Sequence, residues 1–211
     1  MSGSVTFNTL ARTTCAALSL CIALLVWSSQ PATAQAPPEP STKQAPETFK
    51  AAQRATLDAL FAALSAADGD DAARDLVTEI WRVWTQSGRS DVDSLMLQAA
   101  TAMPHRHFGL AGMLLDEVVA LAPDFAEGWN RRATLRWMMG DHAGSLEDID
   151  KVLALEPRHF GALVGRAMIS VDAGRFESAL GDYRRALTVN PFLPERHRVI
   201  PTLQKKLGRD L

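Results

Sequence analysis

Residues of the same kind recur along this chain at a spacing of 34 positions. A proline, a glycine and an alanine each occur three times at this spacing, and two apolar positions follow it as well. The five sets are Pro123, Pro157 and Pro191; Gly140, Gly174 and Gly208; Ala99, Ala133 and Ala167; Leu121, Leu155 and Val189; and Val119, Leu153 and Leu187. Such a period indicates like units of supersecondary structure that stack in a row and bury their apolar faces against one another.

The composition favours helices for these units. The chain has 211 residues, of which 47% are hydrophobic but only 7% aromatic, and alanine and leucine dominate. Alanine and leucine are strong helix formers, whereas strands are enriched in aromatic and β-branched residues. The formal charge of −2 argues against nucleic acid as a partner, because phosphate contacts need clustered Lys and Arg.

The recurring residues resemble the tetratricopeptide repeat (TPR), a family with two antiparallel helices in every 34 residues. In the middle unit, Trp129 holds the large leading position, Ala133 the small position, Gly140 the turn and Pro157 the end of the second helix. The resemblance implies an all-α, TPR-type α-solenoid. Its three repeats are predicted at 92–125, 126–159 and 160–193. The segments 128–133 and 156–163 also resemble exported TPR proteins of alphaproteobacteria.

Two further helical segments flank the three repeats. Leu57, Phe61, Ile80 and Trp84 belong to two apolar stripes with helical spacing, which predicts an N-terminal helical pair at 47–91. We interpret this pair as a degenerate fourth repeat, set off by four extra residues at 88–91. Residues 194–211 are predicted to form a capping helix with a polar outer face, which an open solenoid needs at its end.

The first 46 residues have the features of a secretory leader followed by a spacer. Residues 15–27 are apolar except for Ser19, and Ala32 and Ala34 form an A-x-A signal, which predicts a cleaved signal peptide at 1–34. Residues 35–46 contain four prolines and are predicted to be a linker. We therefore expect a periplasmic protein without stable membrane insertion after cleavage. An uncleaved membrane anchor stays open as the alternative.

The resemblance also implies where a partner would bind, because first helices line the concave face of such solenoids. The positions that map to this face are unusually apolar, and methionine-rich surfaces accommodate varied segments. The predicted partner-binding residues are Met96, Met103, Asn130, Thr134, Trp137, Met138 and Met168. The alternative is that these side chains pack internally.

The sequence gives little support for catalysis or for a cofactor. His142, Ser145 and Asp148 are the residue types of a triad, but three-residue spacing on one helix cannot align them. No metal-binding or nucleotide-binding motif occurs, so we predict no catalytic, metal or cofactor-binding residues. Arg132 and Arg166 recur with the repeat, as do Asp148 and Asp182. They are interpreted as a ladder of ion pairs, with a row for an anionic ligand as the alternative.

These observations together predict a non-enzymatic scaffold that binds a protein or peptide segment on the concave face. One alternative is an accessory or assembly subunit of a cell-envelope biogenesis complex. A binder of small ligands or an enzyme is the other alternative, which would need converging titratable side chains in a deep pocket.

Overall fold

The computed structural model describes residues 47–208, in which helices are joined by short turns and no strand occurs. This confirms the all-α solenoid of repeated helical pairs. The predicted signal peptide at 1–34, the linker at 35–46 and the last three residues of the predicted cap lie outside the described residues. No helix in the described range is both long and apolar enough to span a membrane.

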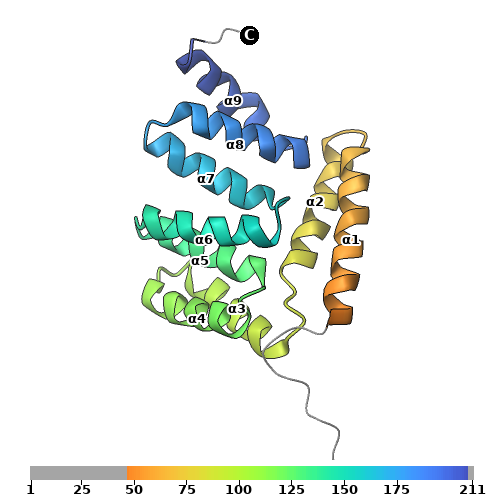
Figure 1. Ribbon diagram of the computed structural model, residues 1–211, viewed down its shortest axis with the longest axis vertical. Coiled ribbons are helices and arrows are strands. Elements are labelled where there is room, and N and C mark those ends of the chain that lie inside the picture. Colours follow the sequence, from red (N-terminus) through yellow and green to blue (C-terminus); the bar gives the residue numbers. More distant parts are fainter. Residues whose placement is uncertain (1–46, 209–211) are drawn as a thin grey trace, which may run out of the picture. The chain divides into compact units, whose positions relative to one another are not determined.

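Three helical pairs follow one another along the stack (Figure 1). They are α3 (Ser90–Ala102) with α4 (Phe108–Leu121), α5 (Ala126–Met138) with α6 (His142–Leu155), and α7 (Phe160–Asp172) with α8 (Phe176–Val189). The two helices of each pair are in close contact, and α4 contacts α5 as α6 contacts α7. The recurring alanines Ala99, Ala133 and Ala167 are all buried, because a methyl side chain lets neighbouring helices approach closely.

The turns inside the three pairs share one backbone conformation. Gly140 and Gly174 have φ angles of 84° and 72°, in the left-handed region that glycine adopts without a steric penalty. The equivalent residue of the first pair is Arg106, with φ of 57°. A side chain in this conformation is disfavoured, so the first turn carries a local strain that the other two lack.

The predicted ladder of ion pairs is present. Arg132 of α5 donates to both carboxylate oxygens of Asp148 in α6, at 2.9 and 2.8 Å, and Arg166 binds Asp182 in the same way at 2.8 and 2.7 Å. Each arginine also contacts the preceding pair. Arg132 bonds to Asp116 of α4 at 2.9 Å, and Arg166 bonds to Asp150 of α6 at 3.2 Å. The ladder therefore ties the second repeat to the first and the third repeat to the second.

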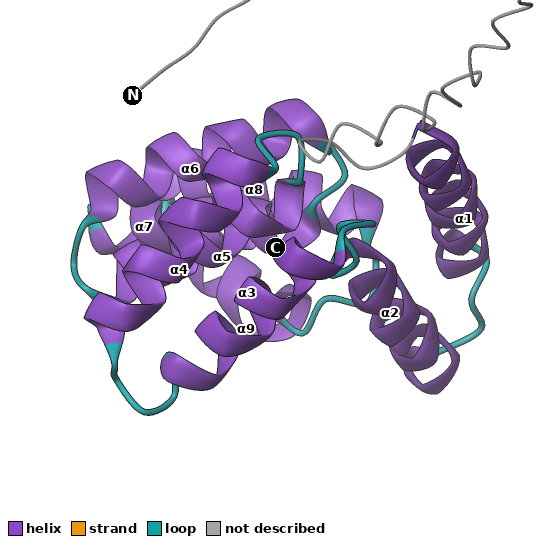
Figure 2. Cartoon of the chain, turned by 90° about the horizontal axis from the view of Figure 1, so that it is seen from below, coloured by secondary structure: helices purple, strands orange, loops and turns teal. Residues whose placement is uncertain are grey.

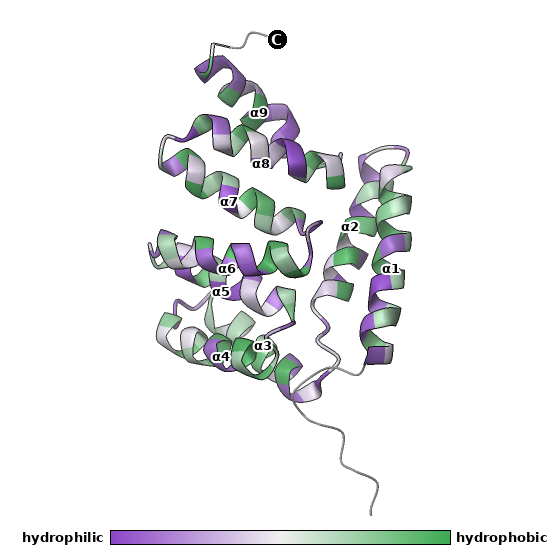
Figure 3. Cartoon of the chain, in the orientation of Figure 1, coloured by the Kyte–Doolittle hydropathy of each residue, from purple (hydrophilic) through white to green (hydrophobic). Residues whose placement is uncertain are grey.

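The stack ends at α9 (Glu195–Lys206), which packs on α8. Leu203 is buried in a cluster with Leu180 and Tyr183 of α8 and Ala167 of α7. The rest of α9 is predominantly hydrophilic (Figure 3), as a helix at the solvent-facing end of a solenoid needs to be. Pro201 lies within the helix, where it removes one backbone donor.

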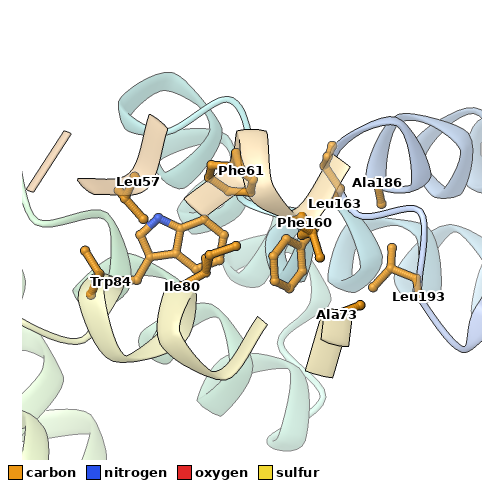
Figure 4. Close-up of a cluster of buried hydrophobic side chains, with 11 residues drawn as sticks. Leu57, Phe61, Ala73, Ile80, Trp84, Phe160, Leu163, Ala186 and Leu193 are labelled. Carbon is orange, nitrogen blue, oxygen red and sulfur yellow. The ribbon is translucent and has the colours of Figure 1, made fainter. Parts of the chain in front are cut away.

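The N-terminal pair consists of α1 (Glu47–Ser65) and α2 (Asp70–Trp84) (Figure 2). Its packing differs from that of the three repeats, because α2 does not pack closely on α3. Its apolar stripes instead share a buried cluster with Phe160, Leu163 and Leu193 of the third repeat (Figure 4). The stripes pointed correctly to buried residues, but the expected stacking as a fourth repeat is replaced by contact with residues of the third repeat, 76 to 136 positions away.

One consequence of this packing is an uncovered helix face at the start of the stack. Leu97 of α3 is 70% exposed, although the equivalent Gly165 of α7 lies beside Ile149 of the preceding repeat. Leu110 and Met113 of α4 are also exposed. Leu97 would be partly covered if the N-terminal pair stacked on α3 in the manner of a preceding repeat, as Gly165 is beside Ile149.

Candidate functional site, a groove between the first helices of two repeats

A hollow of about 200 Å³ lies between α5 and α7, the first helices of the second and third repeats. Apolar side chains form most of its lining. The residues that line it are Asn130, Ala133, Thr134 and Trp137 of α5; Ser145 and Ile149 of α6; and Gly161, Ala162, Val164, Gly165, Met168 and Ile169 of α7. Ligand sites are commonly apolar hollows with few polar groups, and this one matches that description. We call it the α5–α7 groove.

Small residues open the floor of the α5–α7 groove. Gly165 of α7 carries no side chain where a Cβ would approach Ile149, and Ala133 and Ala162 contribute only a methyl group. Larger side chains stand at the rim. Trp137 is 36% exposed and Met168 is 39% exposed, so both present apolar surface to the solvent. A partly exposed indole and a partly exposed thioether in the lining of one hollow suit the burial of an incoming apolar side chain.

The predicted partner-binding residues fall into three groups. Asn130, Thr134, Trp137 and Met168 all line the groove. Met138 is 42% exposed but lies outside the lining. Met96 and Met103 are only 7% exposed and belong to the core of the first repeat, so the expectation that they face solvent is wrong. Their cluster includes Phe125 and Leu135, which come from beyond the first helical pair.

Several groove residues were absent from the predicted set. Ile149 and Ser145 belong to a second helix, from which no contribution to this face was expected. Gly165 and Ile169 of α7 also line the groove. A signal existed for Gly165, because a glycine inside an otherwise helical pattern often has a packing or functional reason.

A buried polar cluster around Glu127 adjoins the groove through Asn130, which lines it. The carboxylate of Glu127, which is 1% exposed, accepts hydrogen bonds from Asn130 Nδ2 at 2.8 Å and Arg131 Nη2 at 2.9 Å. His159 Nε2 lies 3.3 Å from the same carboxylate, and His159 Nδ1 accepts from the backbone N–H of Ala162 at 3.1 Å. Because Nδ1 accepts from Ala162, Nε2 is the ring nitrogen that donates to Glu127.

This cluster determines the charge state of its carboxylate. Burial alone would raise the pKa of Glu127, but its interactions with His159, with Arg131 and with Asn130 together outweigh burial and hold the pKa below its usual value. The ionised Glu127 fixes the orientation of the Asn130 amide at the groove. It also connects α5 to the first turn of α7 through His159.

The described residues contain no group of three or more His, Cys, Asp or Glu side chains placed to hold a metal ion. The Asp–Arg ladder uses Asp148 and Asp182 within ion pairs, in agreement with its structural interpretation. The lining of the groove offers apolar contacts and, at Asn130 and Thr134, groups that can form hydrogen bonds.

A scan of protein-family models gives no match to this chain. The chain is 39% identical over 152 residues to a TPR repeat-containing protein of Rhizobium etli, a match that covers 72% of this chain and 74% of that protein. Among solved structures, the first TPR domain of Spaghetti bound to an HSP90 peptide is similar, with a TM-score of 0.53 and 17% identity over 56% of this chain and 94% of that one. A crystal structure of MamA has a TM-score of 0.52 and 15% identity, and covers 68% of this chain and 88% of that one.

Proposed function

Because this chain belongs to the tetratricopeptide-repeat family, we propose that it is a protein-interaction scaffold that binds a segment of its partner in the α5–α7 groove. The fold is typical of protein–protein interaction modules, and the similar Spaghetti domain is bound to a peptide. The observation that carries the proposal is the apolar hollow with Trp137 and Met168 exposed at its rim. An apolar side chain of the partner enters this hollow, and Asn130 and Thr134 offer hydrogen bonds to its backbone.

A charge placed in the groove is expected to weaken partner binding at least about tenfold, because an unpaired charge is costly to bury against an apolar side chain. Met168→Glu places the charge in the lining, and Met139→Glu is the matched control, because Met139 is 58% exposed and lies outside the lining. A photo-crosslinking amino acid at position 138 captures the partner in intact cells. The bound segment, made as a synthetic peptide, then gives Kd by fluorescence anisotropy.

Both substitutions replace exposed methionines, so both variants should fold like the unmodified protein, which circular dichroism checks. Equal affinity of the Met168→Glu variant and the unmodified protein for the captured segment would contradict the groove proposal. Weakening by Met139→Glu to the same extent would show a general charge effect instead.

We also propose that the protein acts after export to the periplasm. The apolar run at 15–27 and the A-x-A signal ending at Ala34 support export, and both cysteines, Cys15 and Cys21, precede that signal. Amino-terminal sequencing of the protein purified from its native host is expected to begin at Gln35. A sequence that begins at Met1 or Ser2 would contradict cleavage. Recovery of the protein in the cytosolic fraction would contradict export.

A further inference from the structure

The N-terminal pair contacts three successive junctions between helical pairs through three ion pairs. Lys50 binds Asp124 in the turn before α5, at 2.7 Å. Asp58 binds Arg158 in the turn before α7, at 2.6 Å. The third pair joins Asp70 to Arg196 in the first turn of α9, at 2.6 Å. Asp124 and Arg158 are 34 residues apart, so the first two contacts use equivalent places in successive repeats.

Aromatic contacts occupy the middle of this interface. Trp84 stacks on His159 with ring centroids 4.2 Å apart and an angle of 12° between the rings. Trp81 meets Phe160 edge-on at 5.5 Å, and the guanidinium of Arg158 lies 4.6 Å from the ring centre of Phe61. Such contacts supply most of the attraction through buried apolar area, and the ion pairs at either end fix where the N-terminal pair sits along the stack.

The ion pairs at the two ends of the interface shift the pKa values of Lys50 and Asp70. The hydrogen bond to Asp124, more than the one to Glu47, raises the pKa of Lys50. The hydrogen bond from Arg196 lowers the pKa of Asp70. Each shift favours the charged form that the ion pair needs.

The same interface reaches the α5–α7 groove. Gly161 lines the groove, and a Cβ atom at this position would lie only 2.6 Å from Cη2 of Trp81. His159, on which Trp84 stacks, caps α7 through Ala162 and contacts Glu127 of α5. The side chains that hold α5 and α7 together are therefore covered directly by α2.

From these contacts we propose that the N-terminal pair holds the three repeats at a fixed spacing and thereby presets the width of the α5–α7 groove. Lys50, Asp58 and Asp70 are the positioning residues of this arrangement. The effect on binding rests on the proposed function of the groove, whereas the fixed spacing of the repeats does not depend on it.

The test reverses the three charges on the N-terminal pair and leaves the repeats untouched. The variant Lys50→Glu, Asp58→Lys, Asp70→Lys places like charges opposite Asp124, Arg158 and Arg196. The control Arg54→Glu, Asp68→Lys, Asp75→Lys changes the net charge equally, at exposed residues for which the described part of the chain shows no ion pair. Spin labels at exposed Glu117 of α4 and Arg184 of α8 report the distance between the first and third repeats, in full-length protein with Cys15→Ser and Cys21→Ser.

The reversal variant is expected to broaden the distance distribution and to weaken binding of the captured segment at least about fivefold, while the control matches the unmodified protein. An unchanged distribution in the reversal variant overturns the proposal. A broadened distribution with unchanged affinity overturns its groove part. If the unmodified protein binds no segment, the proposed function fails and the spacing proposal is decided by the distances alone. If the triple variant does not fold, the single variant Asp58→Lys replaces it, with Asp75→Lys as the control, and the same outcomes decide.

Discussion

Replacing Trp84 with alanine is expected to lower the free energy of unfolding by about 3–5 kcal/mol, the usual cost of truncating a buried tryptophan. Trp84 is 5% exposed and contacts four aromatic rings, those of Phe61, Trp81, His159 and Phe160. Figure 4 shows Trp84 with two of them, Phe61 and Phe160. Its loss leaves a cavity where α2 meets the third repeat. Urea unfolding followed by circular dichroism measures the change.

Two controls separate this effect from a general loss of tryptophan. Trp137→Ala removes a partly exposed indole at the groove rim and should cost much less. Trp84→Phe keeps an aromatic ring and removes the indole N–H, which is buried without a hydrogen-bond partner among the described residues, so a smaller loss than for alanine is expected. A Trp84→Ala variant as stable as the Trp137→Ala variant would show that the N-terminal pair does not depend on this cluster.

Glu127→Ala is expected to destabilise the protein by about 1–3 kcal/mol, because the buried Nε2–H of His159 is left without an acceptor. The substitution takes away the acceptor for Asn130, Arg131 and His159 at once. Glu117→Ala is the control, since Glu117 is an exposed glutamate on α4. Chemical unfolding at neutral pH measures both variants, and equal stabilities would contradict the role assigned to the buried cluster.

The dependence of the free energy of unfolding on pH tests the role of Glu127 independently. The folded-state pKa of Glu127 lies below its ordinary value of 4.5, so the unfolded state takes up the proton first as the pH falls. The stabilisation is therefore complete above pH 4.5 and is lost as the pH drops through the lower folded-state pKa. In Glu127→Gln this part of the acid sensitivity should be absent. A parallel loss of stability with pH in both proteins would contradict the lowered pKa.

The sequence was most informative where the chain repeats itself. The 34-residue spacing predicted the helical pairs, the turn glycines and the recurrence of Arg132 and Arg166, because each unit repeats the same contacts with its neighbours. The turn at Arg106 departs from the glycine pattern in sequence but not in backbone conformation. Here the two flanking helices determine the conformation, and the side chain adapts to it.

The sequence was least informative where distant segments meet. The apolar stripes that contain Leu57 and Ile80 predicted burial, but a stripe does not specify what covers it. The exposure of Met96 depends on side chains from beyond its own pair, so the pattern of one repeat could not predict it. Asn130, Thr134, Trp137 and Met168 all line the groove, which the first helices of two adjacent repeats define, and their role in partner binding stays a prediction.

The contacts of the N-terminal pair also bear on how such a chain can change in evolution. Solenoids gain or lose whole units readily, because each unit touches only its neighbours. The Asp–Arg ladder would survive removal of one unit, since Asp116 could then meet Arg166 as Asp150 does now. The N-terminal pair is different, because it is matched in length to three consecutive junctions. Deletion or duplication of a unit would leave one of its charges without a counterpart, so the three ion pairs of this helical pair fit an array of three repeats.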